Sequence, residues 1–299
     1  MKRAIVLILA VLTLIIGNYS KAYSQDVLNG IYVKERDRLR KPIPWVPLRE
    51  ADVMWSKTIQ RKIDLREKIN HPLYYPIKPI LERMSLIDLL LVGIKGELEG
   101  EPIIAFDPDG WAGTEFDSPM TFTDIEEKFD ATDKYMDIVD VESGDMILDT
   151  IKGEINSSEV KQYLIKEIWY FDRKYSTLQV RIVGICPIRE YQKDIGGEGL
   201  LIEDEGMQEI TYKKLFWVNF DQLRPILANH EVFNPFNDAE RRSFDDIFYK
   251  RKFGSYVVQE SNVYNDRNIN QYSLGSNSQQ EAERVKDWIM ETEHDLWSY

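Results

Sequence analysis

The sequence predicts an α+β fold in which helices pack with a small, mainly antiparallel sheet, flanked by an extended N-terminal arm and a C-terminal helix. Apolar residues recur at intervals of three and four in the first third of the chain and near its end, which is typical of amphipathic helices. The middle is rich in β-branched and aromatic residues that are typical of strands. Three prolines, Pro42, Pro44 and Pro47, lie just before the first stretch with periodic apolar residues, which begins at Asp52.

Residues 25–50 form the predicted arm. Pro42, Pro44 and Pro47 surround Trp45, and each proline biases the residue before it away from helix. Such a segment either lies along the surface of its own domain or docks on a partner. Docking is favoured by a stiff backbone with an aromatic anchor, because little conformational entropy is lost on binding.

Residues 51–262 form the predicted α+β domain. The first helix is expected from Asp52 to Ile69, because Trp55, Ile59 and Ile63 would share one face. A second helix is expected from Pro79 to Ile94, since proline suits a first helical turn. A strand is expected over 102–106, followed by turn chemistry over Asp107–Gly110.

The middle of this domain is expected to be mainly β. Strands are predicted over Leu164–Asp172 and Leu178–Ile188, with a connection short enough for antiparallel pairing. Further elements are a short helix from Thr123, a helical turn over 158–162, a strand over Lys214–Phe220, a short helix from Asp221, and a helix from Asn237 to Phe253.

The C-terminal part is predicted to be a polar linker followed by a helix. Residues 263–280 are rich in Asn, Gln and Ser, which favours a linker. Residues 281–299 carry an apolar stripe that includes Ala282, Val285 and Ile289. This helix is expected to pack either on its own domain or on a neighbouring molecule.

The first 24 residues have the features of a secretory signal peptide. A short basic start precedes the apolar run from Ala4 to Ile16, and small residues precede the expected cut between Ser24 and Gln25. The apolar run is shorter than the roughly 20 residues that a membrane-spanning helix needs. We therefore expect an exported chain that is not inserted in the membrane after cleavage.

The net charge and the cysteine content limit the classes of partner and the bonds that can stabilise the fold. The formal net charge of -13 becomes -16 once the signal, with its three cations and no acids, is removed. This acidity disfavours nucleic acid and anionic lipid as partners. The single cysteine, Cys186, lies in an apolar context, so it is expected to be a buried small side chain, and the fold cannot contain an internal disulfide.

A search for catalytic and metal-binding motifs predicts no catalytic, cofactor or metal site and no enzyme. His71, His230 and His294 stand in unrelated contexts, and the chain has no HExxH, GxSxG, P-loop or GxGxxG pattern. Two alternatives stay open. One is a periplasmic hydrolase that uses two carboxylates, and the other is a calcium-dependent binding module at the Asp107–Gly110 turn.

Three segments have a distinctive sequence. Residues 41–57 have the sequence KPIPWVPLREADVMWSK, residues 63–76 have IDLREKINHPLYYP, and residues 253–262 have FGSYVVQESN. These segments resemble the GldN/PorN family, a component of gliding motility and type IX secretion. The resemblance implies a periplasmic structural subunit that forms a ring-shaped assembly with the outer-membrane lipoprotein GldK/PorK. It also implies coupling of that ring to the motor subunit GldM/PorM, and attachment to the inner face of the outer membrane through a partner.

Five residues are the candidate partner interface. Arginine, tryptophan and tyrosine dominate many protein interfaces, and the arm and the segment after it are rich in them. The candidates are Trp45, Arg49, Trp55, Tyr74 and Tyr75. For Trp55 a place in the core is favoured instead.

Overall fold

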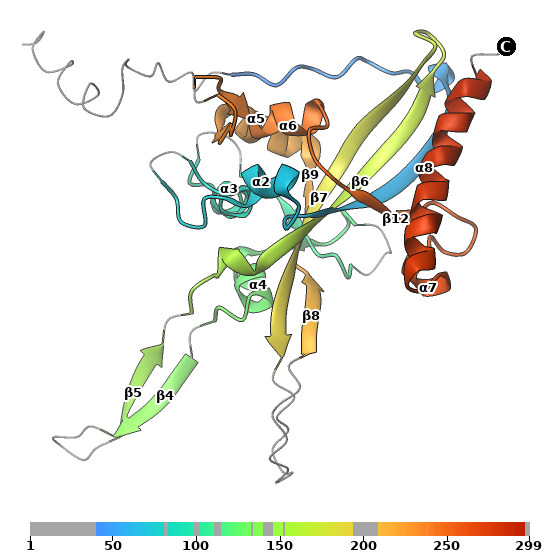
Figure 1. Cartoon of the computed structure of the whole chain (residues 1–299). Coiled ribbons are helices and arrows are strands. Elements are labelled where there is room, and N and C mark those ends of the chain that lie inside the picture. Colours follow the sequence, from blue (N-terminus) through green and yellow to red (C-terminus); the bar gives the residue numbers. More distant parts are fainter. Residues whose placement is uncertain are drawn as a thin grey trace, which may run out of the picture. The chain divides into compact units, whose positions relative to one another are not determined.

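The computed structural model describes residues 40–80, 83–98, 102–110, 115–132, 134–139, 146–151, 153–193, 209–237 and 239–296. A compact unit extends from Arg40 to Tyr299 (Figure 1). The predicted signal peptide, its cleavage site at Ser24 and Gln25, and the first part of the predicted arm lie outside the described residues.

An antiparallel sheet of eight strands organises this unit. Its order is β12-β1-β6-β7-β9-β2-β3, with β8 also paired to β7. Together with the helices it confirms the predicted α+β fold, although the sheet is larger than expected. The strands of this sheet are β1 (Val53–Asp64), β2 (Ala105–Phe106), β3 (Pro119–Met120), β6 (Val160–Asp172), β7 (Thr177–Lys193), β8 (Glu209–Lys214), β9 (Trp217–Asn219) and β12 (Tyr256–Glu260). Two separate hairpins are β4 (Lys134–Val139) with β5 (Met146–Ile151), and β10 (Glu231–Val232) with β11 (Arg242–Ser243).

The predicted pairing of the two central strands is confirmed. β6 and β7 run antiparallel from the Asp172–Thr177 pair to the Val160–Arg189 pair. The predicted strand at 214–220 is shorter, at Trp217–Asn219. It and β8 extend one edge of β7, with Ile185 opposite Val218 and Ile188 opposite Lys214.

The predicted helix from Asp52 to Ile69 is wrong. Residues 53–64 form strand β1, which lies between β6 and β12, and only short 3-10 turns flank it. Trp55, Ile59 and Ile63 do share one face, as expected. Side chains four residues apart also share a face in a strand, where the period is two, so the apolar spacing did not discriminate.

The described helices cover parts of the sheet. They are α2 (His71–Tyr74), α3 (Leu86–Lys95), α4 (Phe122–Lys128), α5 (Phe220–Asn229), α6 (Phe244–Tyr249), α7 (Ile269–Tyr272) and α8 (Ser276–Leu296), with short 3-10 turns η2 (Glu50–Asp52), η3 (Lys68–Asn70) and η4 (Ser157–Glu159). None of the helices in the described ranges is long and apolar enough to cross a membrane.

Three helix boundaries differ from prediction for identifiable reasons. α3 begins after Ser85, whose side chain accepts the Asp88 N–H, so the expected start at Pro79 is too early. α6 occupies only part of the predicted 237–253 helix. Its cap is Ser243, which forms a capping box with Asp246. α8 begins at Ser276, inside the predicted polar linker of residues 263–280.

A large core lies between the sheet and helices α2, α3, α4, α5 and α6; we call it the first core. Ile63 of β1, Tyr163 and Ile165 of β6, and Ile185 of β7 contribute to it from one face of the sheet. α3 adds Leu86, Leu89 and Leu90, and α5 and α6 add Phe220, Leu223, Leu227, Phe244 and Phe248. These side chains are almost completely buried.

The second core lies under α8. Ala282, Val285 and Ile289 pack against Ile59 of β1, Val257 of β12 and Ile269 of α7. The predicted apolar stripe of the C-terminal helix thus packs on its own chain in this structure. On the opposite face of the sheet a small third core contains Leu164, Cys186, Ile188 and Trp217.

Candidate interaction surfaces

Trp45 is held in a socket built from β7, α5 and α6. Its indole Nε1 donates to Asp221 Oδ1 at 2.6 Å. The Arg224 guanidinium lies 4.3 Å from the ring centroid and that of Arg181 lies 5.2 Å away, both within cation–π range. The Tyr249 ring stacks at 5.7 Å, tilted by 34°. We call this set the Trp45 socket.

The socket is rigid because its central arginine is fixed from behind. Arg224 is buried and donates through Nε and Nη2 to the two carboxylate oxygens of Asp245, at 3.0 and 3.3 Å. This bidentate geometry fixes the guanidinium plane against which the indole packs. Arg181 also donates to the Val46 carbonyl at 3.2 Å, so it holds the arm backbone as well.

The other predicted arm and β1 residues lie elsewhere. Arg49 is exposed at the start of η2. Trp55 is half-buried and makes an edge contact with Trp288 of α8, at 5.8 Å between ring centroids. Lys57 lies over the same Trp288 ring at 5.4 Å and pairs with Glu260 at 3.4 Å. Trp55 therefore helps to attach α8 to the sheet.

Tyr74 and Tyr75 lie together at the end of α2. The Tyr74 hydroxyl donates to the Ser158 carbonyl at 3.1 Å and accepts from Lys161 Nζ at 2.5 Å, so this ring is fixed on the body of the fold. Tyr75 is 49% exposed and packs edge-on between His71 and Tyr74, at 5.7 and 4.9 Å. The peptide bond that follows it, Tyr75–Pro76, is cis.

The five predicted interface residues are thus divided among four places, one of which is the exposed position of Arg49 at the start of η2. Trp45 contacts the socket, Trp55 contacts α8, and Tyr74 and Tyr75 contact each other. Arg49 and Tyr75 are free to touch a partner, whereas the other three are at least half-buried against their own chain.

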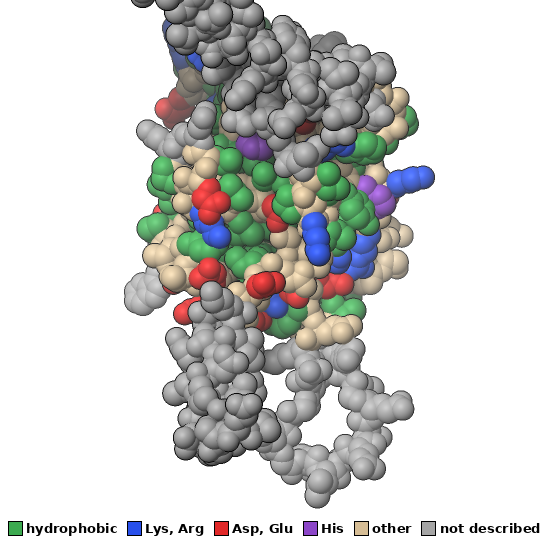
Figure 2. All heavy atoms as spheres, turned by 90° about the vertical axis from the view of Figure 1, so that its left-hand side faces the viewer, with side chains coloured by type: hydrophobic (Ala, Val, Ile, Leu, Met, Phe, Trp, Pro, Cys, Tyr) green, Lys and Arg blue, Asp and Glu red, His purple; other side chains and the backbone are tan. Residues whose placement is uncertain are grey.

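Sequence reasoning missed the exposed apolar side chains around α2. Ile77 and Ile80 follow Tyr75 and are 46% and 62% exposed. Arg83 pairs with Ile80 through both backbone hydrogen bonds, and its guanidinium lies 5.6 Å from the Phe233 ring centroid. Figure 2 shows hydrophobic side chains gathered on this side of the molecule, where α2 and α3 lie in Figure 1. The sequence does contain a signal that this segment differs from the rest of the surface. Residues 68–83 contain three cations and one acid, whereas the chain as a whole is strongly acidic.

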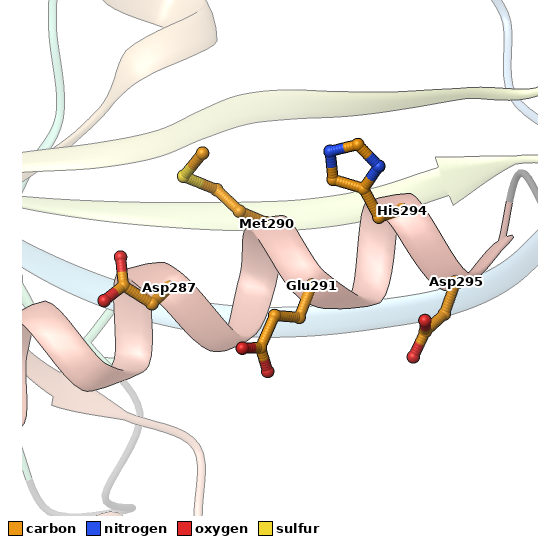
Figure 3. A pocket seen from close by; sticks show the side chains of 5 residues that line it. All are labelled: Asp287, Met290, Glu291, His294 and Asp295. Carbon is orange, nitrogen blue, oxygen red and sulfur yellow. The ribbon is translucent and has the colours of Figure 1, made fainter.

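Two open grooves lie on the described surface. One has a volume of about 410 Å³ and is formed along α8 by Asp287, Met290, Glu291, His294 and Asp295 (Figure 3). The other, of about 430 Å³, is polar and lies beside α4, where its lining includes Asp107, Asp124, Glu127 and Lys128.

The groove beside α4 contains the turn for which calcium was considered. Lys128 Nζ donates to Asp107 Oδ1 at 2.6 Å, and this bond holds the pKa of Asp107 below its ordinary value. The Asp109 backbone N–H donates to the same oxygen, as in a polar turn. Among the described residues, no group of three or more His, Cys, Asp and Glu side chains is arranged to hold a metal ion.

Cys186 is fully buried in the third core. Burial raises the pKa of its thiol to about 12. The thiol is therefore protonated at neutral pH and is shielded from reagents, as the apolar sequence around it predicts.

The described surface of this α+β scaffold carries anchored aromatic side chains, such as Trp45 and Tyr74, next to exposed apolar ones. A family model described as "Gliding motility associated protein GldN" matches residues 48–298, so the chain belongs to the GldN family. This confirms the predicted resemblance to that family, and the match includes residues 48–57, 63–76 and 253–262 of the three segments that carried it. None of the curated proteins matches the chain.

Proposed function

We propose that this chain is an exported structural subunit of the type IX secretion and gliding machinery. In this proposal it acts in the periplasm, at the inner face of the outer membrane. It forms a ring-shaped assembly with a GldK/PorK-like lipoprotein and with identical copies, and it couples that ring to a GldM/PorM-like motor subunit. The observation that carries the proposal is the family match, which covers residues 48–298.

The surface chemistry supports a role in binding proteins. Arg49 and Tyr75 are exposed, and both are residue types that contribute strongly to interfaces. Trp45 sets the path of the arm that carries Arg49, because the Trp45 socket fixes the arm four residues earlier. Arg49 is therefore presented from a held backbone, which lowers the entropy cost of docking.

Co-purification tests this function. The mature chain from Gln25 onward is mixed with the soluble part of the outer-membrane lipoprotein, and the mass of the complex is measured by light scattering after size exclusion. The expected result is a species much larger than a one-to-one complex. A chain that remains a monomer in the presence of the lipoprotein would contradict the proposal.

A matched pair of variants locates the contact. Arg49→Glu is expected to weaken lipoprotein binding, while Lys174→Glu, an exposed charge reversal at the β6–β7 turn, leaves it unchanged. Export is checked separately, by the intact mass of the protein recovered from the envelope, which is expected to begin at Gln25.

A further inference from the structure

The outer face of α8 combines acidic and apolar side chains. Asp287, Glu291 and Asp295 follow one another at intervals of four, so they lie along one side of the helix. Figure 3 shows the three carboxylates on that side, with Met290 and His294 beside them. Met290 is 54% exposed although Ile289, its neighbour, is buried in the second core. We call these five residues the α8 face.

The segment around α2 has the opposite charge and similar apolar content. We call residues 68–80 together with Arg83 the α2 segment. Lys68, Lys78 and Arg83 are its cations, and all three are exposed. Ile77 and Ile80 are exposed between them, and Phe233 lies against Arg83. This segment therefore offers exposed aliphatic and aromatic side chains together with cations, the make-up of a surface to which an acidic partner could bind.

The two surfaces lie on different sides of the molecule. In Figure 1, α8 lies at the right of the view and α2 lies toward the left, with strands β6 and β7 between them. One chain therefore cannot bring its own α8 face onto its own α2 segment without unfolding. Two copies can do so, and the second copy then presents its own α8 face to a third.

From this complementarity we infer that the α8 face of one copy binds the α2 segment of the next copy, head to tail. Asp287 and Glu291 pair with Lys78 and Arg83 of the neighbour, and Met290 packs between Ile77 and Ile80. A contact between two different surfaces of identical subunits repeats without limit or closes into a ring. The inference rests on the proposed function, because it assigns surfaces to the contact between identical copies.

The charges also explain how copies with a large net negative charge can associate. The whole chain carries -13, which becomes -16 without the predicted signal and its three cations, so two copies repel each other on average. The α2 segment is a place where an acidic neighbour meets cations. Opposite charges at matching positions guide orientation and raise the association rate, and both effects weaken as salt screens them.

Cysteine cross-linking tests the contact directly. Ile80→Cys and Met290→Cys are prepared as separate mature chains, mixed in the presence of the lipoprotein, and treated with a short bis-maleimide. The native Cys186 is fully buried, so it does not compete. The expected product is a dimer that contains one chain of each variant. Lys174→Cys mixed with Met290→Cys is the matched control and is expected to give little product.

Charge-reversal variants test whether the proposed ion pairs hold the two copies together. Lys78→Glu with Arg83→Glu is expected to lower the yield of the 80–290 cross-link about tenfold. Asp287→Lys with Glu291→Lys in the other chain is expected to restore most of it. All four side chains are exposed, so the fold is expected to survive, and circular dichroism checks that it does.

The outcomes separate the inference from the proposed function. A chain that binds the lipoprotein but gives no 80–290 product above the control overturns this contact and leaves the proposed function standing. If the lipoprotein, but not a second copy of this chain, protects the cysteine at residue 80 from a mono-maleimide, the choice of a second copy as the occupant is overturned. An 80–290 product formed by a chain that does not bind the lipoprotein upholds the contact and contradicts the proposed function.

Discussion

At the scale of single residues, Trp45 is the best example of a side chain whose role depends on distant partners. Its residue type fitted both an interface and a core. The structure places it against Arg224, Asp221 and Tyr249, more than 170 residues further along the chain. The sequence marked Trp45 as important but could not show which partner it meets, because these contacts exist only after the chain has folded.

Replacing Trp45 with alanine is expected to release the arm. The change removes the half-buried indole, its bond to Asp221 and its packing on Arg224, at a cost of about 2 kcal/mol in unfolding free energy. Urea unfolding measures that loss, and trypsin cleavage after Arg40 should become faster. Val46→Ala is the control, because this exposed neighbour lends only its backbone carbonyl to Arg181. Equal cleavage rates in the two variants would show that the indole does not hold the arm.

Cys186 gives a prediction that depends on pH. The pKa of the thiol is raised from 9.0 to about 12 by burial, so the folded state favours the protonated form. The corresponding stability is fully present below pH 9, and it is lost as the pH rises from 9 toward 12. By pH 11 the wild type should have lost about 3 kcal/mol more than Cys186→Ala, which lacks the thiol. Urea midpoints of both proteins at pH 8 and pH 11 measure the difference, and parallel losses would contradict it.

At the scale of elements, β1 shows why a strand was predicted as a helix. Trp55, Ile59 and Ile63 fit both periods, so their spacing does not distinguish a strand from a helix. In the strand, Lys57 and Arg61 lie on the same face as these apolar residues. They are accommodated by distant partners: Lys57 pairs with Glu260, and Arg61 donates through Nε to Ser255 Oγ at 2.9 Å. Local sequence contains no information about those partners.

Strands β6 and β7 and helix α8 were easier to predict, because their signals are local. The run from Leu164 to Asp172 is rich in β-branched and aromatic side chains, and a short turn leads to its partner strand. In α8, Val285 and Ile289 repeat at helical spacing within a polar sequence. The α8 side that meets the sheet was therefore predictable, whereas its target, Ile59 of a strand predicted as helix, was not.

The attachment of α8 gives a prediction at this scale. Ile289→Ala is expected to lower the unfolding free energy by about 3 kcal/mol, because it opens a cavity in the second core. Met290→Ala, one residue further, removes an exposed side chain and should change stability by less than about 0.5 kcal/mol. Urea denaturation of the two variants measures both effects. Similar losses would mean that α8 is not packed through the Ile289 side.

At the scale of the whole molecule, the first and second cores share the same strands. Ile59 and Ile63 lie on one face of β1, and they belong to the second and the first core respectively. Between the cores, Glu167 of β6 is completely buried and lies 2.9 Å from Arg251 Nη1. Arg251 follows α6, so this pair joins the sheet to the helices of the first core. Opening one core alone would separate Arg251 from Glu167. The buried Glu167 carboxylate would then lack its ion-pair partner, which is strongly unfavourable.

We therefore expect the two cores to unfold in a single transition. Hydrogen exchange under native conditions follows amides of α8 and of β6 near Tyr163 and Ile165 as urea is added. If the unit is cooperative, the opening free energies of the two sets of amides converge as urea is added. Ile289→Ala then lowers the opening free energy of the most protected β6 amides by the same amount as that of the α8 amides. If α8 instead opens as an independent element, Ile289→Ala weakens its protection and leaves β6 unchanged. In that case α8 is a helix that can detach from its own sheet, and the proposed contact of the α8 face with a neighbouring copy would not depend on the packing of the second core.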